Sequence, residues 1–297
     1  MTRPLSDATQ AGGLTPPLKW HGGKHYLTRH VLGLMPPHLH YVEPFFGGGQ
    51  VLFARDPQDP RYLWDGPTSD KRKADGVSEV VNDLDGDLMN FYAVLKDPDL
   101  YARLQHRLDL TLYSEGEWRA ARDRLAGPAG DAVARAADLF TFCRQSLSAR
   151  MTSFAPTVRT RLRGGRNDAV NALWGVVDGL EAVHRRLQDV RLLCRPALDV
   201  IRQEDTPATL FYLDPPYLHE TRAATKVYAH EMSEAEHRQL LDALLACRGK
   251  LMLSGYPSAL YDGALAGWAR HPFDLPNNAA GGRQKAREME VVWCNFY

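Results

Sequence analysis

The sequence is poor in cysteine and has no long apolar run. Its 297 residues contain four cysteines, which are widely scattered, form no CxxC pair and have no histidine at metal-ligand spacing. This usage indicates reduced, mostly packed thiols in a cytosolic protein rather than a metal site. The longest apolar runs fall far short of a membrane span. The N-terminal stretch MTRPLSDATQAGG is polar, so we expect no signal peptide.

The chain also lacks a net charge, because 36 lysines and arginines balance 36 aspartates and glutamates. A zero sum by itself argues against a nucleic-acid-binding protein, but the distribution of the charge matters more. The stretch RMTSFAPTVRTRLRGGR, residues 150–166, has five arginines and no acid. Two interpretations stay open for this stretch: a solvated surface loop, or a localised basic face that contacts a polyanion.

Two segments near the start of the chain share one order of elements. Residues 39–53, LHYVEPFFGGGQVLF, predict a short strand, a glycine-rich turn and the start of a helix. Residues 79–95, EVVNDLDGDLMNFYAVL, predict a strand, a polar turn and an amphipathic helix. Residues 55–78 between them are rich in Pro, Asp, Gly and Lys, and therefore predict a surface loop.

The rest of the chain divides into a helical part and an alternating part. Residues 94–169 carry Arg, Ala and Leu at helical spacing, so they predict a helical insertion. Beyond them we expect a helix over about 172–188, a helix over 233–246 that opens with the capping box Ser233/Glu236, and strands near 190–194, 209–213, 250–254 and 290–296. Such alternation predicts an α/β fold with an open, largely parallel sheet, which binds ligands at the carboxyl ends of its strands.

A glycine triplet, Gly47-Gly48-Gly49, follows the first predicted strand and opens a helix. This placement suits close approach of a ligand to a helix N-terminus, although a lone triplet is more often a simple turn. The triplet matches neither the dinucleotide fingerprint GxGxxG nor a P-loop. Asp83 follows the second strand, where nucleoside-binding α/β proteins place a carboxylate on ribose hydroxyls. Asp85 and Asp87 are expected to be turn and helix N-terminal charges.

The stretch YLDPPYL, residues 212–218, ends another predicted strand abruptly. Neither Pro215 nor Pro216 can donate a backbone hydrogen bond and each fixes its own φ, so the chain must leave the sheet there. The Asp214 carboxylate and the Tyr217 ring are thereby held rigidly at the top of the sheet. An exposed turn is the alternative, but it gives no reason for that combination of residues.

Four motifs occur together in one order: KWHGGK (19–24), EPFFGGG (43–49), VVNDLDGDL (80–88) and DPPY (214–217). This order resembles the Dam-like family of S-adenosylmethionine-dependent DNA adenine methyltransferases. The resemblance covers most of the chain, and is weak in the helical insertion and over residues 55–78. It implies a Rossmann-like methyltransferase sheet, mostly parallel, with an inserted and mainly helical target-recognition domain. Residues 1–93 and 170–297 would form the catalytic domain, and residues 94–169 the insertion.

The family resemblance also implies S-adenosylmethionine as cofactor and a set of residues around it. The Trp20 ring would pack beside the cofactor, and the Lys24 ammonium would lie near its carboxylate. Glu43, Phe45, Gly47 and Gly49 would border the methionine end, and Asp83 would accept hydrogen bonds from the ribose. Glu43 has an equally plausible role as a structural acid that caps nearby amides.

The DPPY motif, by the same resemblance, would hold a target adenine. An adenine inside a duplex cannot present its amine to the methyl donor, so the base must be flipped out. The Asp214 carboxylate and the Pro215 carbonyl would accept the two hydrogens of the amine, and Asp214 would stabilise the positive charge that develops on nitrogen. The Tyr217 ring would replace the lost base stacking. Pro215 and Pro216 would hold these acceptors in place beforehand.

The helical insertion would read the DNA sequence. The candidates for phosphate contacts, some of which would reach a guanine edge, are Arg144, Arg150, Arg159, Arg161, Arg163 and Arg166. Phe154 is either a wedge between bases or, with slight preference, an ordinary core aromatic. No metal and no cysteine nucleophile are required, and we expect His219, His230 and His237 at the surface.

The resulting hypothesis is a site-specific adenine methyltransferase that acts on double-stranded DNA. We expect it in the cytoplasm of a bacterial or phage-infected cell, at the nucleoid when bound to DNA, with a cognate restriction endonuclease as a candidate partner. Three alternatives stay open. The first is methylation of the cytosine amino group, which uses the same geometry. RNA as substrate is the second, and a DNA-binding protein that keeps the cofactor as a mere ligand is the third.

Overall fold

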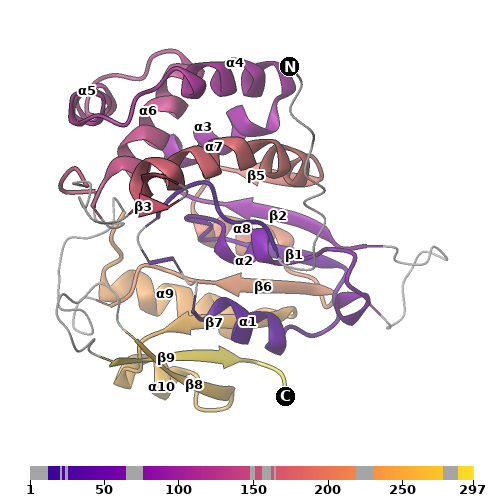
Figure 1. Cartoon of the computed structure of the whole chain (residues 1–297). Coiled ribbons are helices and arrows are strands. Elements are labelled where there is room, and N and C mark those ends of the chain that lie inside the picture. Colours follow the sequence, from indigo (N-terminus) through magenta and orange to yellow (C-terminus); the bar gives the residue numbers. More distant parts are fainter. Residues whose placement is uncertain are drawn as a thin grey trace.

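The computed structural model describes residues 13–20, 22–23, 26–64, 76–147, 151–155, 162–163, 165–218, 230–276 and 287–297. Its centre is a seven-stranded sheet with the order β5-β2-β1-β6-β7-β9-β8 (Figure 1). The strands are β1 (His40–Glu43), β2 (Ser78–Asn82), β5 (Val190–Leu193), β6 (Thr209–Leu213), β7 (Lys250–Gly255), β8 (Ala269–Pro276) and β9 (Arg287–Cys294). The first five run parallel, and β9 pairs antiparallel with both β7 and β8. The expected α/β fold with a mostly parallel sheet is therefore confirmed.

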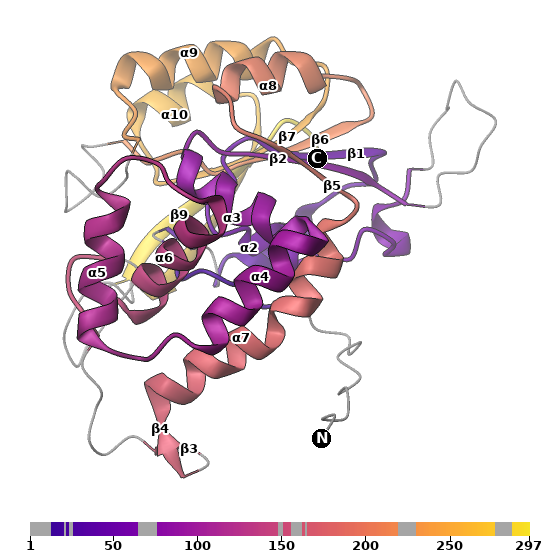
Figure 2. The same cartoon turned by 90° about the horizontal axis from the view of Figure 1, so that it is seen from above.

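Helices cover both faces of this sheet (Figure 2). One face packs against α1 (Thr28–Leu34), α2 (Gln50–Ala54), α3 (Gly86–Lys96) and α7 (Asp168–Leu187), and the other against α8 (Ala197–Glu204), α9 (Glu234–Leu245) and α10 (Ala259–Ala264). The alternation of side chains along β6 explains the two layers: Leu210 and Tyr212 point into the first core, Phe211 and Leu213 into the second. Every residue of β6 is thus buried, as its apolar sequence requires.

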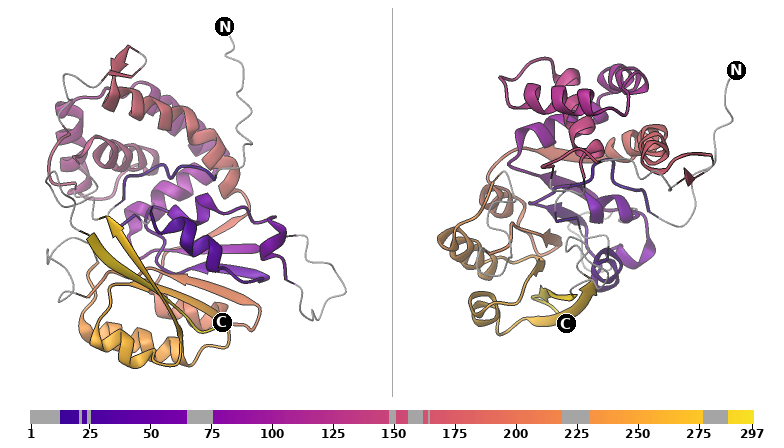
Figure 3. Two further views of the ribbon diagram at one scale, coloured as in Figure 1. Left: turned by 60° about the horizontal axis from the view of Figure 1, so that its bottom comes forward. Right: turned by 60° about the vertical axis from the view of Figure 1, so that its left-hand side comes forward.

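The predicted insertion is helical. It contains α4 (Pro98–Asp109), α5 (Glu115–Leu125) and α6 (Ala132–Gln145), followed by a short hairpin of β3 (Leu162–Arg163) and β4 (Arg166–Asn167). The α6 side chains Phe140 and Cys143 belong to the same core as α3, and the Phe140 ring stacks on Phe91 with centroids 6.2 Å apart. Arg135 of α6 also pairs with Asp87 in the first turn of α3. Figure 3 shows these magenta helices on one side of the molecule, continuous with the layer that covers the sheet.

The structure confirms one predicted helix start and adds elements that the sequence did not indicate. The capping box at Ser233 is present and starts α9, as predicted. The short helices α1, α8 and α10 and the strand β8 were not predicted from the sequence. Strand β8 contains Pro272, which an edge strand tolerates because one row of its backbone groups needs no partner. Among the described residues, no helix is long and apolar enough to cross a bilayer.

The surface-loop prediction for residues 55–78 is wrong at its start. Arg55 is buried, and a 3-10 turn, η1 (Pro60–Tyr62), buries the Tyr62 ring. The middle of this segment, residues 65–75, lies outside the described residues. The Arg55 guanidinium lies over the Tyr41 ring at 4.2 Å and donates to the Glu79 Oε1 atom at 2.6 Å.

The carboxylate of Glu79, on β2, accepts hydrogen bonds from two guanidinium groups, those of Arg55 and Arg186. Arg186 of α7 donates to the same Oε1 atom at 2.6 Å. The side chains of Arg55 and Glu79 are 0% and 1% exposed, so neither charge is solvated. Burial of charges is tolerable only when each has a close counter-charge and hydrogen bonds. This network therefore ties α2 and α7 to the middle of the sheet.

Replacing Glu79 with glutamine leaves the buried Arg55 guanidinium and the partly exposed Arg186 guanidinium without their counter-charge. Loss of one partner of a buried pair costs about 3–5 kcal/mol. We therefore expect Glu79→Gln to lower the free energy of unfolding by about that amount, measured by urea denaturation. Glu115→Gln is the control, because its pair with Arg119 is more than half exposed and is worth less than about 0.5 kcal/mol. Equal losses in the two variants would contradict this account.

Candidate active site

A cavity of about 190 Å³ opens where β1, β2 and β6 end. Strand β1 pairs with β2 on one side and with β6 on the other, so the chain's crossovers diverge at this point and their carboxyl ends border a crevice. Residues predicted for the site that line this cavity are Trp20, Glu43, Phe45, Gly47, Asp83, Asp214 and Pro216. The fold therefore brings together motifs that are up to 196 positions apart in the sequence, from Trp20 to Pro216.

The turn after β1 needs glycine at two positions. Gly47 and Gly49 have φ values of +50° and +70°, a region that side chains disfavour. A Cβ on Gly49 would lie 2.6 Å from the Phe46 ring, and one on Gly47 would lie 3.0 Å from Cδ1 of Trp20. The Trp20 indole thus packs directly on the glycine turn and forms part of the cavity wall.

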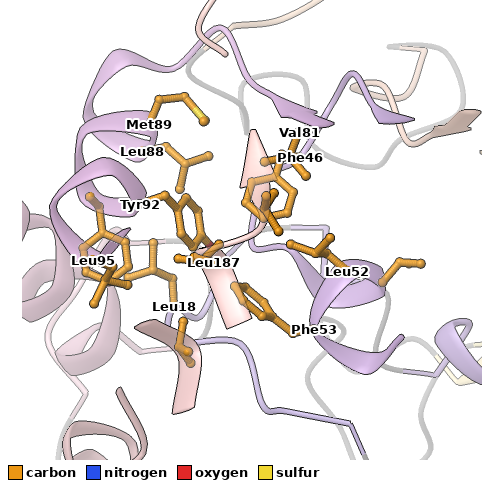
Figure 4. Packing of buried hydrophobic residues seen from close by; sticks show 14 of the residues in the cluster. Leu18, Phe46, Leu52, Phe53, Val81, Leu88, Met89, Tyr92, Leu95 and Leu187 are labelled. Carbon is orange, nitrogen blue, oxygen red and sulfur yellow. The ribbon is translucent and has the colours of Figure 1, made fainter. Parts of the chain in front are cut away.

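An aromatic cluster supports the turn from below (Figure 4). The Phe46 ring contacts Tyr92 of α3 with centroids 4.8 Å apart, and Phe53 of α2 lies 6.1 Å from the same Tyr92 ring. Leu52 and Leu88 complete this packing and are 0% exposed. A close-packed support of this kind fixes the turn, because core side chains leave few voids into which it can shift.

Asp83 connects the turn after β2 to the glycine turn. Its Oδ2 atom accepts a hydrogen bond from the Gly47 N–H at 2.8 Å, and its Oδ1 atom accepts one from the Asp85 N–H at 3.0 Å. Burial raises the pKa of this carboxyl, while both amides oppose the rise by favouring the ionised form. Asp85 caps α3 and Asp87 stands in its first turn, so the expected turn and helix N-terminal roles of these two residues are confirmed.

Asn82, the last residue of β2, connects neighbouring turns, a role that was not predicted from the sequence. Its side-chain amide donates to the carbonyl oxygens of Pro44 and Arg195, each at 3.0 Å, and its Oδ1 atom accepts from the Arg195 N–H at 2.9 Å. One fully buried side chain thereby joins the turns after β1, β2 and β5. The polar residue at the end of an apolar strand, VVN, was the only signal for it in the sequence.

Glu43 ends β1 inside the cavity wall and is 2% exposed. The Tyr41 hydroxyl donates a hydrogen bond to its Oε1 atom at 2.7 Å. Burial raises the pKa of the Glu43 carboxyl to about 8, against the smaller opposing effects of Tyr41 and Arg55. Glu43 is therefore mainly protonated and neutral at pH 7.

Asp214 follows β6 and lines the same cavity. Its Oδ1 atom accepts a hydrogen bond from the Ser254 hydroxyl, which is 2.9 Å away on β7. The Tyr217 ring is 6% exposed and lies edge-on to Tyr256, with centroids 4.6 Å apart. Pro216 lies in the wall of the cavity, whereas Pro215 and Tyr217 do not line it.

The arginines predicted to contact DNA are described only in part. Arg144, near the end of α6, is 9% exposed, and burial lowers its pKa to about 10, so it stays charged at neutral pH. The backbones of Arg163 and Arg166 pair across the β3–β4 hairpin. Arg150, Arg159 and Arg161 lie outside the described residues, and so does Lys24 of the predicted cofactor site.

Two further predictions concern aromatic and histidine side chains. The Phe154 ring lies 5.4 Å from the Tyr113 ring and is half-buried, which favours the core alternative. His237 is fully buried with Nδ1 2.8 Å from the Tyr261 hydroxyl, so its predicted surface position is wrong. His230 is exposed, and His219 lies outside the described residues. No group of side chains among the described residues is arranged to hold a metal ion.

The seven-stranded, mostly parallel sheet covered by helices is the fold of the α/β Rossmann-like methyltransferases. The sequence model of the D12 class N6 adenine-specific DNA methyltransferases matches residues 20–259, from the tryptophan of the cavity wall to the start of α10, and the chain belongs to this family. The family resemblance predicted from the four motifs is thereby confirmed. A member of such a family takes its methyl group from a donor molecule.

One similar protein is the Type II methyltransferase M1.LlaDCHI of Lactococcus lactis subsp. cremoris. The two chains are 35% identical over 85 residues, which are 28% of this chain and 23% of that relative. The matched segment thus spans less than a quarter of the relative's length.

The raised pKa of Glu43 predicts a pH dependence of stability that one variant should remove. Below pH 4.5 the carboxyl is protonated in both states, and its full contribution to stability is present. As the pH rises towards 8, the unfolded chain releases this proton and the folded chain keeps it, so stability falls. Glu43→Gln keeps the acceptor for Tyr41 and cannot titrate.

We therefore expect Glu43→Gln to gain stability over the wild type progressively between about pH 5 and pH 8, by a few kcal/mol at the upper end. The measurement is a urea denaturation series across this range. The titration of Asp83 and all other groups is common to both proteins and cancels in the difference. Parallel curves for the two proteins would show that Glu43 is ionised in the folded state at neutral pH.

Proposed function

We propose that this protein transfers the methyl group of S-adenosylmethionine to the exocyclic amine of an adenine in double-stranded DNA. The observation that carries the proposal is the position of Asp214: it faces the same cavity as the glycine turn and Asp83. A donor held against the glycine turn would therefore have the DPPY carboxylate as its neighbour. Membership of the D12 family supports adenine as the base.

The residues that line the cavity support S-adenosylmethionine as the donor. Side chains at the glycine turn would fill the space beside Trp20, so bare backbone borders this wall. The other walls bring the Glu43 and Asp83 carboxyl groups to the donor, and a ligand with sulfonium and ammonium charges would favour their ionised forms. Asp83 would hold the ribose side, and Glu43, Phe45, Gly47 and Gly49 the methionine side. When bound, the group supplies a methyl that is already reactive.

The chain's own residues then have three tasks on the adenine. The Asp214 carboxylate accepts a hydrogen bond from the amine and stabilises the positive charge that develops on its nitrogen. The Pro215 carbonyl accepts the second hydrogen. The Tyr217 ring offers a stacking face for the flipped base, worth about 1–3 kcal/mol in comparable sites. The short exit from β6 through Pro215 and Pro216 reduces the reorganisation that these groups need.

Recognition of the target sequence is assigned to residues 94–169, with the catalytic domain made of residues 1–93 and 170–297. The hairpin β3–β4 supports this division, because it projects from the start of α7 and has arginines at both ends of its turn (Figure 2). Arg144, Arg150, Arg159, Arg161, Arg163 and Arg166 are proposed to contact the DNA. The Type II description of the lactococcal relative supports a cognate restriction endonuclease as partner.

The test is transfer of labelled methyl from S-adenosylmethionine to unmethylated genomic DNA, followed by nucleoside analysis and mapping of the modified positions. We expect N6-methyladenine at one short sequence motif. Methylated cytosine would keep the geometry of the site and overturn the choice of base. Tight binding of the donor without any product would instead favour a binding protein that lacks catalysis.

Removal of the Asp214 carboxylate should affect the transfer rate, and removal of the Asp83 carboxylate should affect the affinity for the donor. Asp214→Ala is expected to abolish transfer while the Kd for S-adenosylmethionine stays within about twofold, because its partner is the base. Asp83→Ala removes a carboxylate that would accept hydrogen bonds from the ribose of S-adenosylmethionine. It should therefore raise the Kd for S-adenosylmethionine about 10–100-fold. Isothermal titration with the donor and a methyl-transfer assay separate the two effects. Loss of donor binding in Asp214→Ala would contradict the assigned role.

A further inference from the structure

The end of β7 lies beside the DPPY segment. Leu213 of β6 pairs with Leu253 of β7 in parallel register, so the next residue of each strand, Asp214 and Ser254, stands at the same edge of the sheet. Ser254 also pairs with Val292 of β9. A residue held between two strands has a fixed backbone, so the position of its hydroxyl depends only on its rotamer.

The Ser254 hydroxyl has one proton and two acceptors within reach. The Asp214 Oδ1 atom is 2.9 Å away, and the Leu213 carbonyl oxygen is 3.2 Å away. The carboxylate is both nearer and charged, so the proton points to it. The Ser254 oxygen lies 3.3 Å from the Tyr212 hydroxyl, which can donate to it in turn.

These three groups form an ordered chain in a dry part of the sheet. Ser254 and Tyr212 are 0% and 2% exposed, so water does not compete for their hydrogen bonds. With the Tyr212 O–H directed at Ser254 and the Ser254 O–H directed at Asp214, each donor has one acceptor. Such a chain is stronger than its isolated links, since each bond polarises the next.

We propose that Ser254 is a positioning residue, which sets the plane of the Asp214 carboxylate for the incoming amine, with Tyr212 directing its proton. This inference rests on the proposed function of Asp214. A carboxylate on a single Cβ–Cγ bond rotates freely unless one oxygen is tied. A hydrogen bond to Oδ1 from the neighbouring strand restricts that rotation before the substrate arrives.

The competing role for Ser254 is purely structural, as a hydroxyl that satisfies the Leu213 carbonyl at the strand end. The two roles differ in what a substitution changes. A positioning role changes the rate of the chemical step at full occupancy of both ligands. A structural role changes the folded fraction and the affinities, while molecules that remain folded transfer at the normal rate.

The experiment measures the single-turnover methyl-transfer rate at saturating donor and DNA, together with both Kd values and the melting temperature. Ser254→Ala is expected to transfer roughly 10–100-fold more slowly, the usual cost of a misplaced catalytic group. Both Kd values should stay within about twofold. Ser254→Thr keeps the hydroxyl and is expected to restore most of the rate.

Tyr212→Phe is the second variant, because it keeps the ring volume and removes only the hydroxyl that directs Ser254. It should slow transfer less than Ser254→Ala, and the double variant should be no slower than Ser254→Ala alone. Tyr62→Phe is the matched control: its ring is 2% exposed, as that of Tyr212 is, and its hydroxyl donates to the Leu32 carbonyl. Neither Tyr62 nor Leu32 lines the cavity, so the rate should not change.

Three results would overturn the inference. Ser254→Ala that transfers within twofold of the wild type removes the positioning role and leaves the proposed function intact. A slower rate that is fully explained by a smaller folded fraction or weaker binding assigns Ser254 the structural role. A wild-type protein that transfers no methyl group to any DNA overturns the proposed function and, with it, this inference.

Discussion

The parallel pairing of β1 with both β2 and β6 is the constraint on which the site depends. Because these three strands run in one direction, Glu43, Asp83 and Asp214 all leave the sheet at the same edge. Three carboxyl groups around one volume repel each other and resist desolvation. The sheet overcomes this repulsion through the packing of its two cores, each of which buries one set of alternating side chains.

Each of the three acids is stabilised by a different physical means. Glu43 takes up a proton and accepts a hydrogen bond from Tyr41. Asp83 stays close to two backbone amides, and Asp214 to the Ser254 hydroxyl. A site built in this way is less stable than an apolar one would be.

The ion network behind the sheet complements this arrangement. Arg55 lies over the Tyr41 ring, and Tyr41 in turn donates to Glu43, so the buried Arg55–Glu79–Arg186 network reaches the cavity through one ring. Since Arg186 belongs to α7, which starts at the β3–β4 hairpin, one helix connects that hairpin to the ion network. The helical region and the sheet are thus held in one orientation by packing and by charge.

The order of the elements and the residues at the strand ends can be predicted from the sequence alone. Apolar runs stopped by EPFFGGG, by NDLD and by DPPY are local signals, because glycine and proline restrict the backbone wherever they stand. Those signals were sufficient to predict that Gly47, Asp83 and Asp214 lie just beyond the ends of strands. Other features are visible only in the tertiary structure: Ser254 lies against Asp214, Asn82 joins three turns, and Arg55 and His237 are buried. These contacts depend on which strands are neighbours and in what register, and that choice is made by the packing of side chains distant in sequence, which no local pattern records.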